Sequence, residues 1–285
     1  MSAPDFDEEF YLAANPDVAL AVRAGQFRSG REHYDRFGRK EGRSALRGEV
    51  PDGAVRMDHR AVTLSLLRGS GIEIGALDSP CPVPRGCHVT YCDVHPVEEI
   101  RALFPELSKL RLQDPDVLVD LNGRGLVEFQ DDSLSFVILN HVIEHVANPL
   151  RVMGELCRVL RPGGHLVIAI PDERFTFDRG RRKTSFEHLL HELETGVTEV
   201  SLDHFDDLIA LRSPEIVRAG PAAVAARAEE LRRRAEHAHV WDGATFRDFL
   251  VRALSHFGVT ARFVAEFPAE ETRHEYFTVL EKLPG

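Results

Sequence analysis

Three acidic residues follow successive apolar segments, where they could bind the hydroxyl groups of a nucleotide-type cofactor. Glu73 lies in "GIEIGA", and Asp93 comes 20 residues later at the end of "CHVTYCDV". An acid about 20 residues beyond the first turn is placed to accept hydrogen bonds from ribose hydroxyls. Asp120 ends the next apolar segment, "DVLVDL", and can reach the adenine side. The sequence therefore predicts a cofactor at an edge where these three acids meet.

The turn after Glu73 indicates which class of cofactor the chain binds. A dinucleotide diphosphate requires a Gly-x-Gly-x-x-Gly turn at a helix start. This chain has Gly75, followed by Ala76 and by prolines at 80, 82 and 84. We therefore disfavour an NAD-dependent oxidoreductase and expect a cofactor that lacks a diphosphate and carries a cationic centre. Gly75 stands where close approach of the backbone is most needed.

The segment "HVIEH" places His141, Glu144 and His145 at positions i, i+3 and i+4. If the segment is helical, the three side chains share one face and could bind a divalent metal ion. The alternative is that His145 bonds to the backbone and fixes the loop. We favour this alternative over the metal.

Further histidines fall in the long segment 172–244. A reaction at a hydroxyl group needs a base to take its proton, and histidine is the side chain best matched to neutral pH. His188, His204 and His239 are therefore candidate bases, although for any single one of them a surface or packing role is favoured. A basic run, which could recognise an anionic substrate or remain solvated, precedes them; it consists of Arg174, Arg179, Arg181, Arg182 and Lys183.

Alternating strands and helices must position these residues. Five short apolar, β-branched segments between residues 71 and 171 predict strands covered on both faces. The helix expected over 148–160 has Asn148 as N-cap and Pro149 at its first position. Two final strands, joined by a polar segment in which no helix is expected, predict an antiparallel hairpin. We expect an α/β, doubly wound, Rossmann-like sheet of seven strands.

The chain divides into a helical module over residues 1–47 and a larger domain over 54–285, joined by a linker at 48–53. Within the larger domain, residues 172–244 are too long for a bare loop. We expect them to form a helical cap over the carboxyl ends of the strands, where open α/β sheets bind ligands.

The stretch "LNHVIEHVANPLRVMGELCRVLRPGGHLVIAIPD", together with "IEIGA", "YCDV" and "VDL", resembles the class I S-adenosylmethionine-dependent methyltransferases. The resemblance covers about residues 70–172 and the terminal hairpin. It implies S-adenosylmethionine as cofactor, with Glu73 near its methionine end, Asp93 on its ribose, and Asn140 and His141 beside its sulfonium. His141 is therefore a fourth catalytic candidate. The implied cofactor-binding set is Glu73, Gly75, Ala76, Asp93, Asp120, Leu121 and Asn140.

The first 47 residues resemble a small helical module found in bacterial surface and secreted proteins and beside glycosyltransferases, with the pattern "YL..NPDV..AV..G.....HY...G..EGR". A core this small rarely stands alone. We expect it to pack on the next domain or on a protein partner. Its usual neighbours suggest a glycan-like acceptor.

Composition narrows the function further. The net charge of −11 argues against a nucleic-acid partner. There is no apolar run of membrane-spanning length, and the acidic N-terminus lacks signal-peptide features, so we expect a cytoplasmic protein with four reduced cysteines. The predicted function is methyl transfer to a small-molecule or glycan-like acceptor, at oxygen, with a protein substrate and a quinone-like phenol as open alternatives. The alternative is a non-catalytic methyltransferase-like binding or scaffold protein whose glycine turn has been lost.

Overall fold

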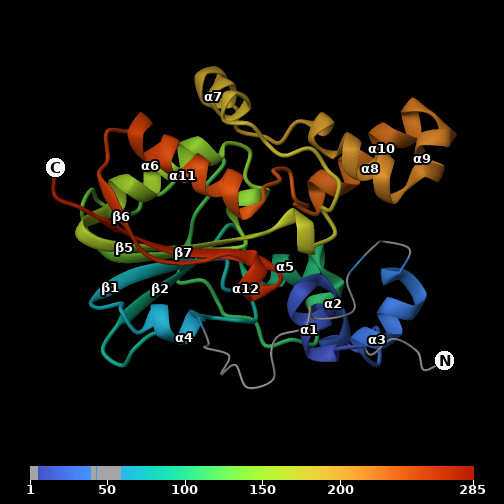
Figure 1. Ribbon diagram of the computed structural model, residues 1–285, viewed down its shortest axis with the longest axis horizontal. Helices are drawn as coiled ribbons and strands as arrows, with labels where there is room; N and C mark the ends of the chain where they lie inside the picture. The colour runs from blue at the N-terminus through green and yellow to red at the C-terminus, as the bar shows by residue number, and fades with distance from the viewer. Residues whose placement is uncertain (1–5, 40–42, 44–58) are drawn as a thin grey trace.

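A computed structural model describes residues 6–39, 43 and 59–285 (Figure 1). A seven-stranded sheet with the order β3-β2-β1-β4-β5-β7-β6 forms its centre. The first five strands pair in parallel, and β7 is antiparallel to both β5 and β6. This confirms the predicted Rossmann-like fold. The strands are β1 (Ser70–Ile74), β2 (His88–Asp93), β3 (Val117–Leu118), β4 (Leu134–Asn140), β5 (Leu160–Pro171), β6 (Ala261–Phe267) and β7 (Glu275–Lys282).

Two elements differ from expectation. The segment "DVLVDL" was expected to be a full strand, but only Val117–Leu118 pairs with β2, at the edge of the sheet. The expectation that no helix joins the last two strands is wrong, because α12 (Ala269–Thr272) lies there. Pro268, with φ at −69°, leads into this single turn, and Arg273 ends it in the left-handed conformation. Four residues were too few to show a helical period in the sequence.

Helices cover both faces of the sheet. On one face lie α6 (Pro149–Val159) and α11 (Gly243–His256), and α4 (His59–Leu64) lies on the other (Figure 1). The Asn148 side chain accepts a hydrogen bond from the Arg151 amide at 2.9 Å, which confirms the predicted N-cap. The apolar face of α6 packs into the larger core with β1, β4 and β5. Burial from two sides fixes the strand ends that carry the site. Along one edge, α5 (Val97–Leu103) and η2 (Pro105–Leu107) follow β2.

The segment 172–244, hereafter the insertion, is helical, as its composition indicated. It contributes η4 (Glu173–Phe175), α7 (Phe186–Thr195), η5 (Leu202–Phe205), α8 (Asp206–Arg212), α9 (Pro214–Ala219) and α10 (Pro221–Arg233). A separate apolar cluster holds it together, and Ala147 from the loop after β4 is part of that cluster. The insertion therefore packs beside the carboxyl end of β4.

The N-terminal residues form α1 (Glu8–Ala14), α2 (Pro16–Arg23), α3 (Gly30–His33) and a π-helical turn, η1 (Tyr34–Gly38). Tyr11 is buried, and its hydroxyl lies 2.9 Å from Nδ1 of His33. Arg23 forms an ion pair with Asp78, so the module contacts the loop that follows β1. The expected linker at 48–53 lies outside the described residues, and the domain boundaries remain predictions.

No helix in the described ranges has both the length and the apolar character needed to cross a membrane.

Candidate cofactor and acceptor site

The turn after β1 brings the backbone close to the loop after β4. Gly75 has φ at +74°, and a Cβ built on it would lie 2.7 Å from Cγ2 of Val142. Its amide donates to the Cys92 carbonyl at 3.0 Å, which joins the ends of β1 and β2. Both the conformation and the contact with Val142 require glycine here, and the predicted approach of a cofactor to Gly75 remains a prediction.

Glu73 holds the proline-rich segment that follows this turn. Both of its carboxylate oxygens accept a hydrogen bond from the Cys81 amide, at 3.0 and 3.1 Å. The side chain is buried, and this burial raises the pKa of Glu73. Its visible role is to fix the path of the loop. Contact with a cofactor remains a prediction, as it does for Ala76.

Asp93 lies at the end of β2, and one of its two carboxylate oxygens accepts hydrogen bonds from the backbone. Its Oδ1 accepts from the amides of Val94 at 2.8 Å and His95 at 3.5 Å. Its Oδ2 makes no hydrogen bond within the described ranges. Partial burial raises the pKa of Asp93, although these backbone bonds oppose the shift. The arrangement leaves an acceptor oxygen at the strand end, as binding of a ribose requires.

Asp120 shapes its own loop. Its Oδ1 accepts from the amides of Asn122 and Gly123 at 3.0 and 2.9 Å, so the side chain closes a tight turn. Leu121 is buried in the larger core. The structure therefore explains Asp120 by the turn and Leu121 by packing, and their contact with adenine remains a prediction.

Asn140 ends β4 with an unsatisfied acceptor. Its Nδ2 lies 3.4 Å from Sγ of Cys81, whereas its buried Oδ1 has no hydrogen-bond partner in the described part of the chain. An unpaired buried acceptor costs about 1–3 kcal/mol, so a ligand donor would be favourable here. A cofactor donor at this atom, beside Asp93 at the end of β2, would be consistent with the predicted site.

His141 adopts φ at +54°, and its Nε2 lies 2.8 Å from Oε2 of Glu275. The ring stacks on His274 with an interplanar angle of 9°. Burial alone would lower the pKa of His141, but the interactions with Glu144 and Glu275 outweigh it and raise the value to about 9. His141 is therefore protonated at neutral pH, and a protonated imidazole cannot accept a proton from an acceptor.

Glu275 lies at the centre of a group of charged and histidine side chains. It was not predicted as a site residue from the sequence. Its carboxylate is 0% exposed and lies 3.0 Å from Nε of Arg60 and 2.8 Å from Nε2 of His59. Burial opposes ionisation, yet Arg60 and the two histidines at 141 and 274 hold the pKa of Glu275 well below its usual range. The only sequence signal was an acid at the start of the apolar strand "EYFTVL".

His141, Glu144 and His145 do not form one metal site. The segment is a single 3₁₀ turn, η3 (Ile143–His145), and His141 precedes it, so the helical spacing assumed from the sequence does not apply. Oε1 of Glu144 lies 3.7 Å from Nδ1 of His141 and 3.8 Å from Nε2 of His145. His141 groups instead with His274 and Glu275, whereas Glu144 and His145 stay together and group with His237 of the insertion. The predicted metal set is therefore incorrect as a single group.

His145 makes the backbone contact that the alternative interpretation required. Its Nδ1 lies 2.6 Å from the Ala235 carbonyl, so Nδ1 carries the proton and donates it. Burial lowers the pKa of His145, although the nearby Glu144 carboxylate opposes the shift. A neutral ring with its Nε2 lone pair available lies directly after β4.

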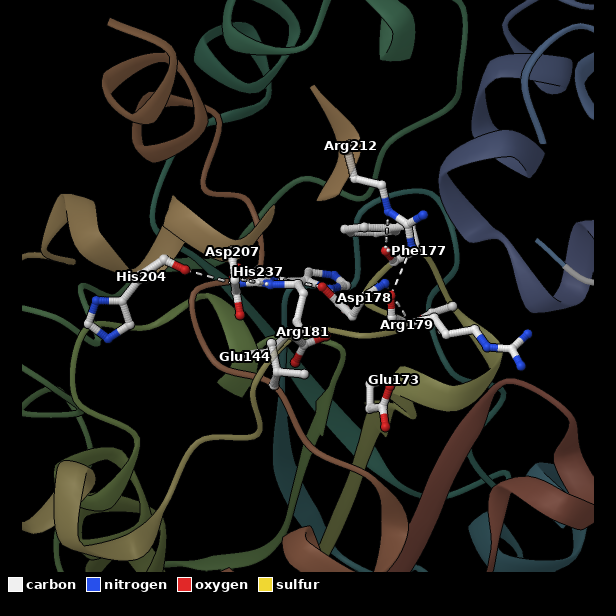
Figure 2. Close-up of polar contacts among 12 residues, drawn as sticks. Glu144, Glu173, Phe177, Asp178, Arg179, Arg181, His204, Asp207, Arg212 and His237 are labelled. Atoms are coloured by element: carbon white, nitrogen blue, oxygen red, sulfur yellow. Dashed lines mark hydrogen bonds and ion pairs between the residues drawn. The ribbon is translucent and has the colours of Figure 1, made fainter. Parts of the chain in front are cut away.

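Arg181 organises the insertion from its interior (Figure 2). Its guanidinium pairs with Asp178 at 2.7 Å and Asp207 at 2.9 Å, and it donates to the carbonyls of His237 and His204, both at 2.9 Å. Two other members of the basic run are also paired within the chain: Arg174 with Asp172 and Glu270, and Lys183 with Asp242. These three side chains are therefore already neutralised within the chain. If the basic run binds an anionic substrate, Arg179 and Arg182 are the members that would bind it.

The predicted bases His188, His204 and His239 lie together, around Glu192. His239 is completely buried, and burial lowers its pKa to about 3. The three histidines were predicted from the sequence, but Glu192 was not. Glu192 lies four residues after His188 on one helix, a spacing that places the two side chains on the same face.

Part of the chain matches a known protein family. Residues 68–168 match the sequence model described as a methyltransferase domain. This segment is a class I S-adenosylmethionine-dependent methyltransferase domain. The match begins just before β1 and ends within β5, so the methyltransferase domain contains the strand ends described above. The family and cofactor predicted from the sequence are confirmed for this domain.

Relatives of the methyltransferase domain differ in their coverage. The chain is 31% identical over 157 residues to a Mycolicibacterium smegmatis protein described as "Probable S-adenosylmethionine-dependent methyltransferase", covering 51% of this chain and 56% of that one. It is 35% identical over 81 residues to human thiol S-methyltransferase TMT1A, covering 28% and 33%. A methyltransferase structure from Aquifex aeolicus has 15% identity and a TM-score of 0.40, covering 81% of this chain and 93% of that one. The chain spans less than half the length of the first five curated relatives it matches.

Proposed function

We propose that this chain is an S-adenosylmethionine-dependent methyltransferase that methylates a hydroxyl oxygen of a small-molecule or glycan-like acceptor. The observation that carries the proposal is the buried, unpaired Oδ1 of Asn140 at the end of β4, together with Asp93 at the end of β2, whose Oδ2 makes no hydrogen bond to the described residues. In a domain of this family they face the edge where open α/β sheets bind ligands.

Asp93 would accept from the ribose hydroxyls, and Asn140 would accept from a donor of the cofactor. Gly75 allows the turn after β1 to lie against Val142 of the loop after β4, which keeps the two strand ends of the proposed site together. When bound, S-adenosylmethionine supplies an electrophilic methyl group on a sulfonium. The protein then has to hold the acceptor in line with that methyl group and remove the acceptor's proton.

We assign the proton acceptor to Nε2 of His145. The hydrogen bond from Nδ1 to Ala235 fixes the tautomer that leaves Nε2 free, and the side chain is partly open to solvent. His141 is unsuited because it is already protonated, and His239 is unsuited because it is completely buried. The acceptor would then lie between the loop after β4 and the insertion.

A thiol is the alternative to a hydroxyl as the methyl acceptor, because several matched relatives are named thiol S-methyltransferases. A thiol ionises near neutral pH, whereas a hydroxyl requires a base. The neutral imidazole beside the strand ends therefore favours oxygen. The resemblance of the N-terminal module to one found beside glycosyltransferases supports a glycan-like acceptor.

Calorimetry with S-adenosylhomocysteine tests the cofactor site. Asp93→Asn keeps the size of the side chain but removes the charge and the acceptor Oδ2. Loss of a charged hydrogen bond costs about 1.5–3 kcal/mol, so we expect affinity to fall by about 10- to 150-fold. Asp114→Asn is the control because it makes the same charge change at an exposed loop position.

Equal affinity in the folded Asp93→Asn variant would refute this placement of the cofactor. Failure of the wild-type chain to bind S-adenosylhomocysteine at all would support the non-catalytic scaffold instead. With binding established, a panel of hydroxyl and thiol acceptors tests the second part of the proposal. Methylation of thiols alone would reject oxygen as the target.

A further inference from the structure

Four side chains from three separate segments of the insertion converge on one point. His188 and Glu192 lie one turn apart on α7, His204 lies on η5, and His239 precedes Trp241. We call these four residues the insertion cluster. None of them belongs to the methyltransferase segment 68–168.

The ligand atoms of the cluster are spaced as a metal ion requires. Nε2 of His188 and Nε2 of His204 lie 3.0 Å apart, and each lies 3.1 Å from Oε1 of Glu192. Nε2 of His239 lies 3.9 Å from Oε2 of Glu192. Ligands about 2.0–2.1 Å from a tetrahedral ion lie about 3.3 Å from one another. The three separations among His188, His204 and Oε1 of Glu192 lie just below that value, and one ligand atom from each of the four residues lies within 4.8 Å of the others.

Several of these atoms lack other partners. Oε2 of Glu192 and both ring nitrogens of His239 are buried without a hydrogen bond to the described residues. Such atoms are rare in folded proteins unless a ligand, ion or water completes them. The cluster thus contains two side chains, each more than nine-tenths buried, that point unsatisfied into a common centre.

The surroundings prepare His204 to act as a ligand. Its Nδ1 lies 2.9 Å from the Ser201 hydroxyl, which donates its own proton to Asp203, and 3.1 Å from the Ser201 carbonyl. Both oxygens therefore accept from Nδ1, which leaves the lone pair on Nε2. Such an outer hydrogen bond accompanies nearly all metal-bound histidines. Arg181 holds the backbone carbonyl of His204 (Figure 2), and Trp241 stacks on His239 at 5.6 Å between ring centroids.

We propose that the insertion cluster binds a divalent transition-metal ion, zinc by its chemistry, through three imidazoles and one carboxylate. Imidazole and carboxylate ligands in tetrahedral array suit zinc, and calcium and magnesium prefer all-oxygen sites. Four protein ligands fill the tetrahedron, so the ion is structural. It joins α7, η5 and the segment at His239.

The position explains what the ion holds in place. The His239 amide donates to the Glu144 carbonyl at 3.0 Å, directly after β4, and the Asn148 side chain donates to the Glu192 carbonyl at 3.0 Å. Two of the ligands are therefore tied to the loop that leads from β4 to α6. The ion would fix the insertion against the methyltransferase domain, and it would occupy the histidines that the sequence suggested as bases. This inference does not depend on the proposed function.

Metal analysis of the full chain, exposed to zinc and then desalted, tests the site. We expect one equivalent of zinc in the wild-type chain. His188→Ala removes a ligand whose side chain is 41% exposed, so it creates no buried void. Loss of an outer-shell partner already costs 10- to 100-fold in metal affinity, so we expect His188→Ala to weaken zinc by about 100-fold or more. His191→Ala, an exposed position on the same helix, is the control and should bind as the wild type does.

Cobalt substitution supplies a second readout. Co²⁺ in the wild-type chain should give the intense visible absorption of a tetrahedral site, and His188→Ala should lose it. A chelator should lower the Tm of the wild type and of His191→Ala but not of His188→Ala. Wild-type protein that takes up no zinc, or a His188→Ala variant that retains wild-type zinc affinity, would overturn the proposal.

Discussion

Replacing Glu275 by glutamine should destabilise the fold far more than replacing an ordinary surface acid. The Glu275 carboxylate is 0% exposed and contacts Arg60, His59 and His141. Glutamine keeps the shape of the side chain but leaves Arg60 and the protonated His141 without this buried counter-charge. Removal of one partner from a buried ion pair costs about 3–5 kcal/mol, and we expect a loss in this range in the free energy of unfolding.

The pH dependence gives the prediction a sign. The pKa of His141 rises from 6.5 to about 9 in the folded chain, so its contribution is complete below pH 6.5 and disappears as pH rises through 9. Each unit of pKa shift corresponds to 1.36 kcal/mol, and partial exposure reduces the total to about 2–3 kcal/mol. Glu275 has a lowered pKa, so its contribution is present above about pH 4.5 and is lost only at lower pH. In Glu275→Gln the decline between pH 6.5 and 9 should be smaller, because Glu144 is then the only one of the two carboxylates left beside His141.

Urea unfolding at pH 6, 7.5 and 9, followed by circular dichroism, measures both effects. Glu281→Gln is the matched control, because Glu281 lies on the same strand and pairs with the exposed Arg262. Exposed pairs contribute about 0–1 kcal/mol, so this control should change little. A loss below about 1 kcal/mol in Glu275→Gln, or a wild-type stability that does not fall between pH 6.5 and 9, would refute the charge assignment.

Two further predictions concern the methyl-transfer site. Gly75→Ala should cost about 1–2 kcal/mol for the left-handed backbone, with more from the contact with Val142, and should abolish detectable binding of S-adenosylhomocysteine by calorimetry; full binding would show that the cofactor does not approach this turn. His145→Gln can still donate to Ala235 but is a poor base, so kcat with a hydroxyl acceptor should fall by about 100- to 10,000-fold while the Kd for S-adenosylhomocysteine stays within about twofold. Unchanged kcat would remove His145 from proton transfer.

Local features of the sequence determined most of the architecture. Apolar β-branched segments gave the buried parallel strands, and Asn148 before Pro149 gave the start of α6, because both signals are complete within a few residues. Gly75 was identified as a position of close approach for the same reason. Short elements with weak local signals, such as α12, were missed.

The sequence also supplied residue types that could act as ligands and bases, but not their grouping. His141 was expected to act with Glu144 and His145, yet its close partner is Glu275, 134 residues away. A 3₁₀ turn in place of an α-helix rotated His145 toward the insertion.

Only the tertiary structure brought His188, Glu192, His204 and His239 to one point, and only it decided which histidines are protonated. A contact between distant segments depends on how strands, helices and loops pack, and a pKa depends on the burial and charges that packing creates. The amino-acid sequence determines these contacts and pKa values only by way of the folded structure. Neither can therefore be determined from the spacing of residues along the chain.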